Sequence, residues 1–237
     1  SRQIMLPQMD VGGQEKLLAA KVLIIGLGGL GCPAAMYLAS AGVGQLTLAD
    51  DDLVDLTNLQ RQIAHNTSQL GKSKVSSVGE TLQALNPGVA VIQLQQKLEG
   101  SSLNDQISQA DVVVDATDNF SSRFEINRYC IQQKVPLVSG AAIRLEGQIT
   151  VFDSRQAHSP CYQCLYEEGV DVELSCSETG VMAPVVGIIG TMQAMEVIKL
   201  ITGIGNVLIG RLAILDAQNM SFTEMKLLKN NNCPACN

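Results

Sequence analysis

Short apolar runs alternate with longer segments of mixed polarity along the first half of the chain. Residues 21–26 read Lys-Val-Leu-Ile-Ile-Gly, and residues 111–115 hold three valines between two aspartates. Short runs that are apolar throughout are typical of strands buried on both faces of a parallel sheet. The same pattern predicts further strands at 45–50, 89–94 and 136–139.

The segments between these runs have the length and spacing of helices. We expect helices at about 14–20, 29–42, 72–85 and 120–133. Pro87 lies just beyond the third of them, where a proline ends a helix. Strands alternating with helices predict an α/β fold: a Rossmann-like, mostly parallel sheet with helices on both faces.

After about residue 145 the pattern changes. We expect a strand at 147–152, a long helix at about 185–202 and one or two strands between 210 and 226. These C-terminal strands are predicted to extend the same sheet, perhaps in antiparallel orientation. We therefore expect one domain over 1–237, with a Rossmann-like nucleotide-binding part at 1–145 and an extension at 146–237. A polar stretch at about 166–179 is predicted to be a mobile loop.

Composition limits the class of protein. The chain is 46% hydrophobic but only 3% aromatic, which predicts an aliphatic core, and its formal net charge of -7 argues against general nucleic-acid binding. The long helix at 185–202 holds Gln193, Glu196 and Lys199, so we expect a buried helix and no membrane span. Seven cysteines without an export signal predict a reducing, cytoplasmic setting.

A glycine-rich turn, Gly26-Leu27-Gly28-Gly29-Leu30-Gly31, follows the first predicted strand and opens a helix. Gly26 permits a tight turn, Gly28 the close approach of a phosphate, and Gly31 close packing of helix on strand. Asp50 ends the second strand, where a carboxylate reaches a ribose hydroxyl. The motif does not separate NAD, FAD and ATP, and its alternative is a turn that only packs.

Charged residues distinguish among the nucleotides. Arg61 and Lys74 follow the second strand, and a reaction at a triphosphate needs such cations because charge builds on the phosphate oxygens. Asp118 follows the fourth strand, where it is placed to hold Mg²⁺. The alternatives are a solvated polar turn with a surface lysine, and an Asp118 or Asn119 that only caps the next helix.

Two Cys-x-x-Cys pairs lie far apart in the chain: Cys161 with Cys164, and Cys233 with Cys236. Four thiolates suit a tetrahedral structural Zn²⁺, here a long-range staple that ties the chain end to the middle of the protein. The alternatives are a redox-active pair or unrelated buried thiols.

The remaining candidates for chemistry are few. Cys32 and Cys130 fall within predicted helices and are expected to be core thiols. The two histidines, His65 and His158, lie in no motif, and we assign neither a catalytic role. Cys176 lies in the polar loop before the long helix.

Six motifs occur in order along the chain. They are Gly-Leu-Gly-Gly-Leu-Gly, Leu-Ala-Asp-Asp-Asp, Asn-Leu-Gln-Arg-Gln, Asp-Ala-Thr-Asp-Asn, Ser139 to Gln148, and Thr179 to Pro184. As a set they resemble the MoeB/ThiF/HesA family, bacterial relatives of the ubiquitin-activating enzymes, over essentially the whole chain. The resemblance implies ATP- and Mg²⁺-dependent adenylation of the C-terminal glycine of a small ubiquitin-like sulfur carrier protein, with release of pyrophosphate.

The resemblance also implies roles for individual residues. Arg61, Lys74 and Asp118 are expected to act in catalysis. Arg2 matches an arginine that reaches the partner subunit's nucleotide in the family's homodimers. Cys176 matches the ThiF cysteine that links covalently to the carrier, and family members of this type carry the four-cysteine zinc site. The expected nucleotide-binding set is Gly26, Gly28, Gly29, Gly31, Asp50, Asp52, Thr57, Asn58, Leu59, Gln60, Arg61, Lys74, Asp118 and Asn119.

Two other functions stay open on sequence alone: an NAD-dependent dehydrogenase, and a non-catalytic nucleotide-binding scaffold. The carrier, ThiS-like (thiamine) or MoaD-like (molybdopterin), is also open. The first half of the chain is nearer ThiF, while residues 139–152 and 220–228 are nearer MoeB. Because the chain lacks the fused rhodanese domain of some relatives, sulfur would come from a separate donor protein.

Overall fold

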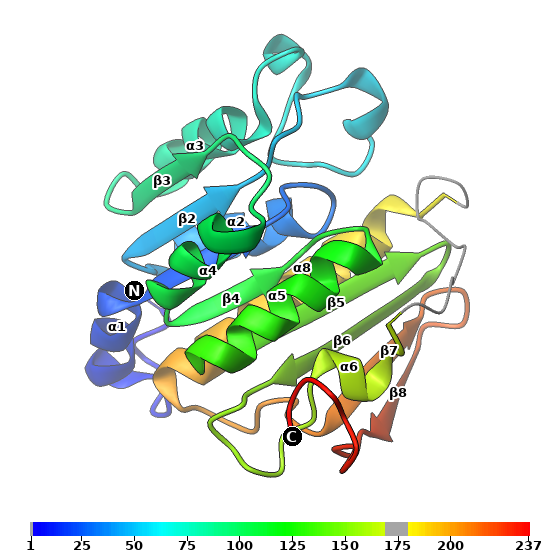
Figure 1. Cartoon of the computed structure of the whole chain (residues 1–237). Helices are drawn as coiled ribbons and strands as arrows, with labels where there is room; N and C mark the ends of the chain where they lie inside the picture. Colours follow the sequence, from blue (N-terminus) through cyan, green and yellow to red (C-terminus); the bar gives the residue numbers. More distant parts are fainter. Residues whose placement is uncertain (1, 169–179) are drawn as a thin grey trace.

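The computed structural model describes residues 2–168 and 180–237 (Figure 1). Among these residues, eight strands form one sheet in the order β3-β2-β1-β4-β5-β6-β7-β8. The strands are β1 (Lys21–Ile25), β2 (Gln45–Ala49), β3 (Ala90–Leu94), β4 (Val112–Asp115), β5 (Leu137–Ile143), β6 (Glu146–Phe152), β7 (Arg211–Asp216) and β8 (Ser221–Lys226). Strands β1 to β5 are parallel, and β6, β7 and β8 continue the sheet in antiparallel pairs.

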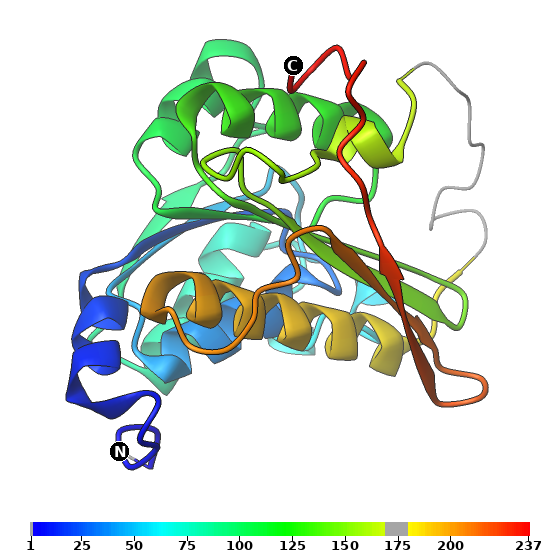
Figure 2. The ribbon, with the colours of Figure 1, turned by 90° about the horizontal axis from the view of Figure 1, so that it is seen from below.

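Helices cover both faces of the sheet (Figure 2). They are α1 (Asp10–Ala19), α2 (Gly31–Ala41), α3 (Lys74–Leu85), α4 (Gly100–Ser108), α5 (Phe120–Gln133), α6 (Tyr162–Leu165) and α8 (Ala183–Thr202), with 3₁₀ turns η1 (Leu56–Asn58) and η2 (Thr67–Gln69). Helices α1, α2, α3 and α8 pack together on one face, and α4, α5 and α6 pack on the other. The first layer buries an aliphatic cluster against the sheet, and the second buries aliphatic side chains together with Phe124, Phe152 and Tyr162.

Helix α8 lies at the centre of the first layer. By length and composition alone it could cross a membrane, but 50% of its apolar window is buried, and it packs on α2, β5 and β6. Its contact with α2 is very close, because a Cβ added at Gly190 would lie 2.2 Å from the carbonyl oxygen of Leu30. This is the packing of a core helix, as the sequence analysis predicted.

The predicted fold class is confirmed, with shifts at the element ends. The first helix begins at Asp10, earlier than expected, and β5 runs on to Ile143 because it pairs with β6 along its whole length. Helix α4 was not predicted, since only Leu103 and Ile107 are buried in it and its other residues are mostly small or polar. The antiparallel extension by β6, β7 and β8 agrees with the prediction.

The predicted loop at 166–179 is described only at its start. Tyr166 packs against the rings of Phe120 and Tyr162, and Glu168 lies within ion-pair distance of Arg128. The rest of the predicted loop, residues 169–179, lies outside the described residues. The division of the single domain at residue 145 stays a prediction.

Two glycines of α8 allow a matched test of this packing. A Cβ at Gly190 would also lie 2.6 Å from Pro33, whereas one at Gly187 meets nothing within 4 Å. We expect Gly190→Ala to lower the free energy of unfolding by about 1–3 kcal/mol through overpacking. Gly187→Ala should raise it by about 0.5–1 kcal/mol through helix propensity. Urea unfolding of both variants measures the difference, and equal changes would contradict the close approach of α2 and α8.

Candidate functional site

A cavity of about 410 Å³ lies at the carboxyl ends of the parallel strands. Strand β1 pairs with β2 on one side and with β4 on the other, so the chain changes direction across the sheet at this point. Doubly wound sheets bind ligands in the crevice that such a reversal creates. The turn after β1 and the loop after β4 form the walls of this crevice.

The glycine turn presses against its surroundings. Gly26 has a φ of +90°, and a Cβ there would lie 2.7 Å from the carbonyl oxygen of Ala116. A Cβ at Gly31 would lie 1.9 Å from the carbonyl oxygen of Gly26, so α2 can begin directly on the turn only without a side chain. Gly28 and Gly29 line the cavity, where the start of a helix offers N–H groups to an anion.

Asp50 fixes the turn from the end of β2. Its carboxylate accepts hydrogen bonds from the backbone N–H of Leu27 at 2.6 Å and of Asp52 at 2.9 Å. Burial raises the pKa of Asp50, while the nearby Lys74 amine opposes that shift. The carboxylate of Asp50 thus lies at the cavity wall, and its predicted hydrogen bond to a ribose hydroxyl stays a prediction.

Lys74 is the first residue of α3, whose N-cap is Ser73. Its side chain is only 6% exposed, and its amine lies 2.7 Å from a carboxylate oxygen of Asp52, which is 67% exposed. The lysine is therefore a buried cation at the cavity wall, paired with an acid that faces solvent. An anionic ligand entering the cavity can replace that acid.

Arg61 lines the cavity and follows η1 in the chain. Asp55 caps this turn by accepting a hydrogen bond from the N–H of Thr57. Among the described residues the Arg61 guanidinium makes one hydrogen bond, from Nη1 to the carbonyl oxygen of Thr57 at 3.4 Å. Its other donors remain available to a ligand.

The loop after β4 contributes an acid and a helix cap. Asp118 is exposed and lines the cavity. The side chain of Asn119 accepts a hydrogen bond from the N–H of Ser122 at 2.9 Å and so caps α5. The capping alternative therefore describes Asn119, whereas the carboxylate of Asp118 stays free to face a ligand or a cation.

The structure brings most of the predicted nucleotide residues to one cavity. Those that line it are Gly26, Gly28, Gly29, Asp50, Asp52, Asn58, Arg61, Lys74, Asp118 and Asn119. Gly31 instead packs behind the turn, and Thr57, Leu59 and Gln60 do not line the cavity. Arg2 is exposed near the start of the chain, away from this wall, and Cys176 lies outside the described residues.

A second cavity of about 250 Å³ adjoins the first. The two share Asp118, Asn119, Arg123 and Ala142. Its remaining walls are mainly apolar and aromatic, and we call it the apolar groove. The residues that complete it are Phe120, Ala141, Ile143, Glu146, Gly147, Gln148, Tyr166 and Ile214.

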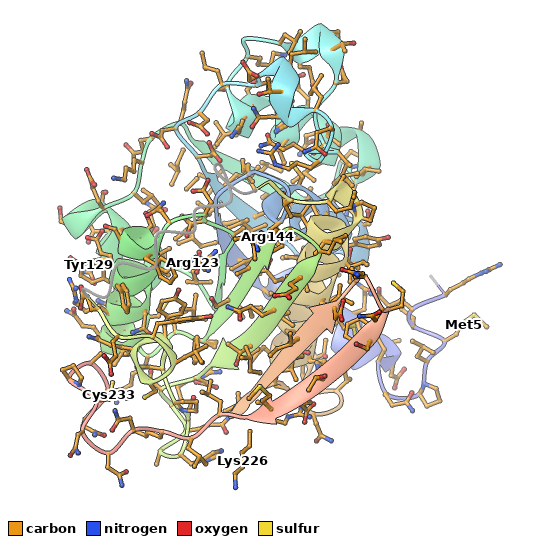
Figure 3. The ribbon with its side chains drawn as sticks, turned by 90° about the vertical axis from the view of Figure 1, so that its right-hand side faces the viewer. Met5, Arg123, Tyr129, Arg144, Lys226 and Cys233 are labelled. Atoms are coloured by element: carbon orange, nitrogen blue, oxygen red, sulfur yellow. The ribbon has the colours of Figure 1, made fainter. Side chains whose placement is uncertain are left out.

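Arg123, between the two cavities, was not predicted from the sequence (Figure 3). Its guanidinium donates to the carbonyl oxygens of Thr117 at 2.5 Å and Gly140 at 3.3 Å. Burial acts to lower its pKa, but the carboxylate of Asp115 and neighbouring tyrosines outweigh burial, and the pKa is raised. An arginine in the first turn of a helix carries no sequence signal that separates it from a surface residue.

The four cysteines of the two Cys-x-x-Cys pairs come together, as predicted. The sulfur of Cys161 lies 3.9 Å from that of Cys164 and 3.6 Å from that of Cys233, and Cys164 and Cys236 are 3.6 Å apart. A tetrahedron with metal–sulfur bonds of about 2.3 Å has edges of about 3.8 Å, so this geometry fits a four-coordinate metal. Burial and the neighbouring thiols raise the pKa of Cys161 to about 12, so the thiols need a cation to ionise together.

Known proteins resemble the chain over its whole length. The ThiF family profile matches residues 1–235. The molybdopterin-synthase adenylyltransferase of Escherichia coli (strain K12) is 49% identical over 236 residues, 100% of this chain and 94% of that protein. The sulfur carrier protein ThiS adenylyltransferase of the same organism is 44% identical over 236 residues, 100% of this chain and 93% of that protein.

Solved structures share the fold. The crystal structure of selenomethionine PaaA has a TM-score of 0.79 at 26% identity, covering 92% of this chain and 67% of that one. Escherichia coli MccB with ATP has a TM-score of 0.83 at 23% identity, covering 96% of this chain and 69% of that one. With a matching profile over nearly every residue and relatives this similar, the chain belongs to the ThiF family.

Proposed function

We propose that this protein uses ATP to adenylate the C-terminal glycine carboxylate of a small ubiquitin-like sulfur carrier protein. The relatives that are 44–49% identical over the whole chain are adenylyltransferases for molybdopterin synthase and for ThiS. The observation that carries the proposal is the wall at Asp118 that the nucleotide cavity shares with the apolar groove. A nucleotide in one cavity and a peptide end in the other would meet there.

The reaction joins two groups that repel each other. The carboxylate oxygen attacks the α-phosphorus and forms a new P–O bond, while the bond to the bridging oxygen breaks and pyrophosphate leaves with that electron pair. The product is a mixed acyl-phosphate anhydride. A carboxylate is already ionised at neutral pH, so the attack needs no strong base.

The cations of the cavity are placed to remove this repulsion. Arg61 offers a planar set of donors and Lys74 a compact charge, both on the cavity wall. When the triphosphate enters, Lys74 exchanges the carboxylate of Asp52 for phosphate oxygens. Asp118 would hold Mg²⁺, which neutralises charge on the phosphates when it is bound.

The apolar groove suits the extended tail of a carrier. Its lining is mainly apolar and aromatic, and it adjoins the nucleotide cavity along a wall that includes Asp118 and Arg123. Small residues in its wall, Ala141, Ala142 and Gly147, leave room for a glycine-rich chain end. A nicotinamide dehydrogenase has no use for Arg61 with Lys74, and a silent scaffold has no use for the groove.

Three further assignments belong to the proposal. We infer a homodimer in which Arg2 reaches the partner's nucleotide, as the resemblance to the family's homodimers implies; Arg2 does not line the cavity of its own chain. Zn²⁺ is the metal that best suits four thiolates at these distances. A separate protein would donate the sulfur.

Carrier-dependent ATP–pyrophosphate exchange tests the activity. The purified protein is incubated with ATP, labelled pyrophosphate and either a MoaD-like or a ThiS-like carrier, and carrier-AMP is sought by mass spectrometry. We expect exchange with at least one carrier and none with a carrier that lacks its terminal glycine. Absence of exchange with both carriers, or a nicotinamide-dependent absorbance change, would contradict the proposal.

Arg61→Ala should lower the exchange rate about 100-fold or more, because one donor to the developing charge is lost. Arg61→Lys should recover only part of the rate, since a point charge does not replace the planar fork. Arg128→Ala, on the surface of α5 outside both cavities, is the matched control and should exchange normally. A wild-type rate in Arg61→Ala would rule out the charge-neutralising role.

Cys233→Ser should release the metal and lower the melting temperature, because three thiolates hold a structural metal much less tightly than four. The zinc content measured by elemental analysis should fall from about one ion per chain. Cys32→Ala, at a buried thiol in the helix layer on the opposite face of the sheet, should lower the melting temperature but keep the metal. Unchanged metal content in Cys233→Ser would refute the zinc assignment.

A further inference from the structure

A buried polar network lies directly beneath the glycine turn, around a histidine to which no role was assigned. The imidazole of His65 is 7% exposed. Its Nδ1 lies 2.7 Å from the hydroxyl oxygen of Ser77, and its Nε2 lies 3.4 Å from the carbonyl oxygen of Leu27. The thiol of Cys32 reaches the same carbonyl oxygen at 3.2 Å. The network therefore contacts the peptide between Leu27 and Gly28 in the turn.

The hydrogen-bond partners fix where the protons lie. The side-chain oxygen of Gln69 accepts from the N–H of Asn66 at 3.1 Å, and its nitrogen donates to Glu80 at 3.2 Å. The hydroxyl of Ser77 must then donate to that oxygen of Gln69, 2.8 Å away, so Ser77 accepts from Nδ1–H of His65. A neutral His65 leaves Nε2 as an acceptor.

The thiol of Cys32 supplies the proton between the two remaining acceptors. Its sulfur lies 3.7 Å from Nε2 of His65 and 3.2 Å from the Leu27 oxygen. Burial raises the pKa of Cys32 to about 12, so the thiol keeps its proton. This excludes the thiolate–imidazolium pair of a nucleophilic cysteine and leaves a neutral chain of contacts from Leu27 to Ser77.

Both ends of this chain lie in the nucleotide site. At one end, the N–H of Leu27 is held by Asp50 and its carbonyl oxygen is faced by the network. At the other end, Ser77 lies one turn after Lys74 on α3, and both side chains are buried. The network therefore connects the turn that receives the phosphates to the helix that carries the cation.

We propose that His65 is a positioning residue for the nucleotide: with Ser77 it sets the distance between the glycine turn and Lys74. The inference rests on the proposed nucleotide site and adds a residue that does not line that cavity. A histidine that only filled space would tolerate an apolar side chain of similar size without a specific loss of nucleotide affinity. If His65 is a positioning residue, replacing either His65 or Ser77 lowers the affinity for the nucleotide.

The test compares Ser77→Ala with Ser76→Ala, its neighbour on α3, whose hydroxyl is outside the network. We expect Ser77→Ala and His65→Leu each to raise KM for ATP about ten-fold, the factor that one buried hydrogen bond contributes. KM for the carrier should stay unchanged. The double variant should be no worse than His65→Leu, because both changes break one chain of contacts. His65→Asn, which can still donate to Ser77, should recover part of the affinity.

Direct titration of ATP, without a carrier, separates this inference from the activity. A wild-type protein that binds ATP but shows no exchange would overturn the proposed function, and the titration would still compare the variants. An unchanged affinity for ATP in Ser77→Ala, which removes a single oxygen, would overturn the role of His65. So would an equal loss in Ser76→Ala. His158→Gln, at an exposed position, controls for a change of histidine content.

Discussion

Backbone packing too close for any side chain determines where the site lies. The carbonyl oxygen of Gly26 touches the start of α2 at Gly31, and the turn also presses on the loop at Ala116. These contacts hold the ends of β1 and β4 together, so that the glycine turn and Asp118 face one cavity. The same kind of contact, between Gly190 and Leu30, holds α8 against the back of this assembly. The position of the glycine turn relative to Asp118 follows from these approaches.

The net negative charge of the protein opposes the binding of an anionic nucleotide. A chain of net charge -7 repels a triphosphate at long range, so binding depends on cations within the cavity. Lys74 is buried and would be unstable as an isolated charge, and Asp52 compensates it until a ligand arrives. If the protein acts as proposed, the Lys74 ammonium would exchange this carboxylate for a phosphate and would not lie unpaired. Because the Asp52 carboxylate already faces solvent, releasing it from Lys74 would cost little free energy of desolvation.

The sequence predicted features that have local signatures and missed those that arise from tertiary contact. The buried strands, the glycine turn and the cysteine pairs each show in a few consecutive residues. Arg123 and His65 do not, because their surroundings come from segments distant along the chain, such as Gly140 and Leu27. Helix α4 escaped prediction for a related reason, since its few buried apolar side chains gave too weak a period.

The four-cysteine cluster and one wall of the apolar groove are built by the same short segment, α6 and the residues next to it. Helix α6 has four residues and is too short to be stable alone. Cys161, just before it, and Cys164, near its end, contact Cys233 and Cys236 of the C-terminal segment. Figure 3 labels Cys233 in that segment. Tyr162 lies between these two cysteines and packs on the rings of Phe124 and Phe152. Tyr166 follows them in the chain and lines the groove. A metal at this cluster would therefore order the wall of the groove that Tyr166 forms.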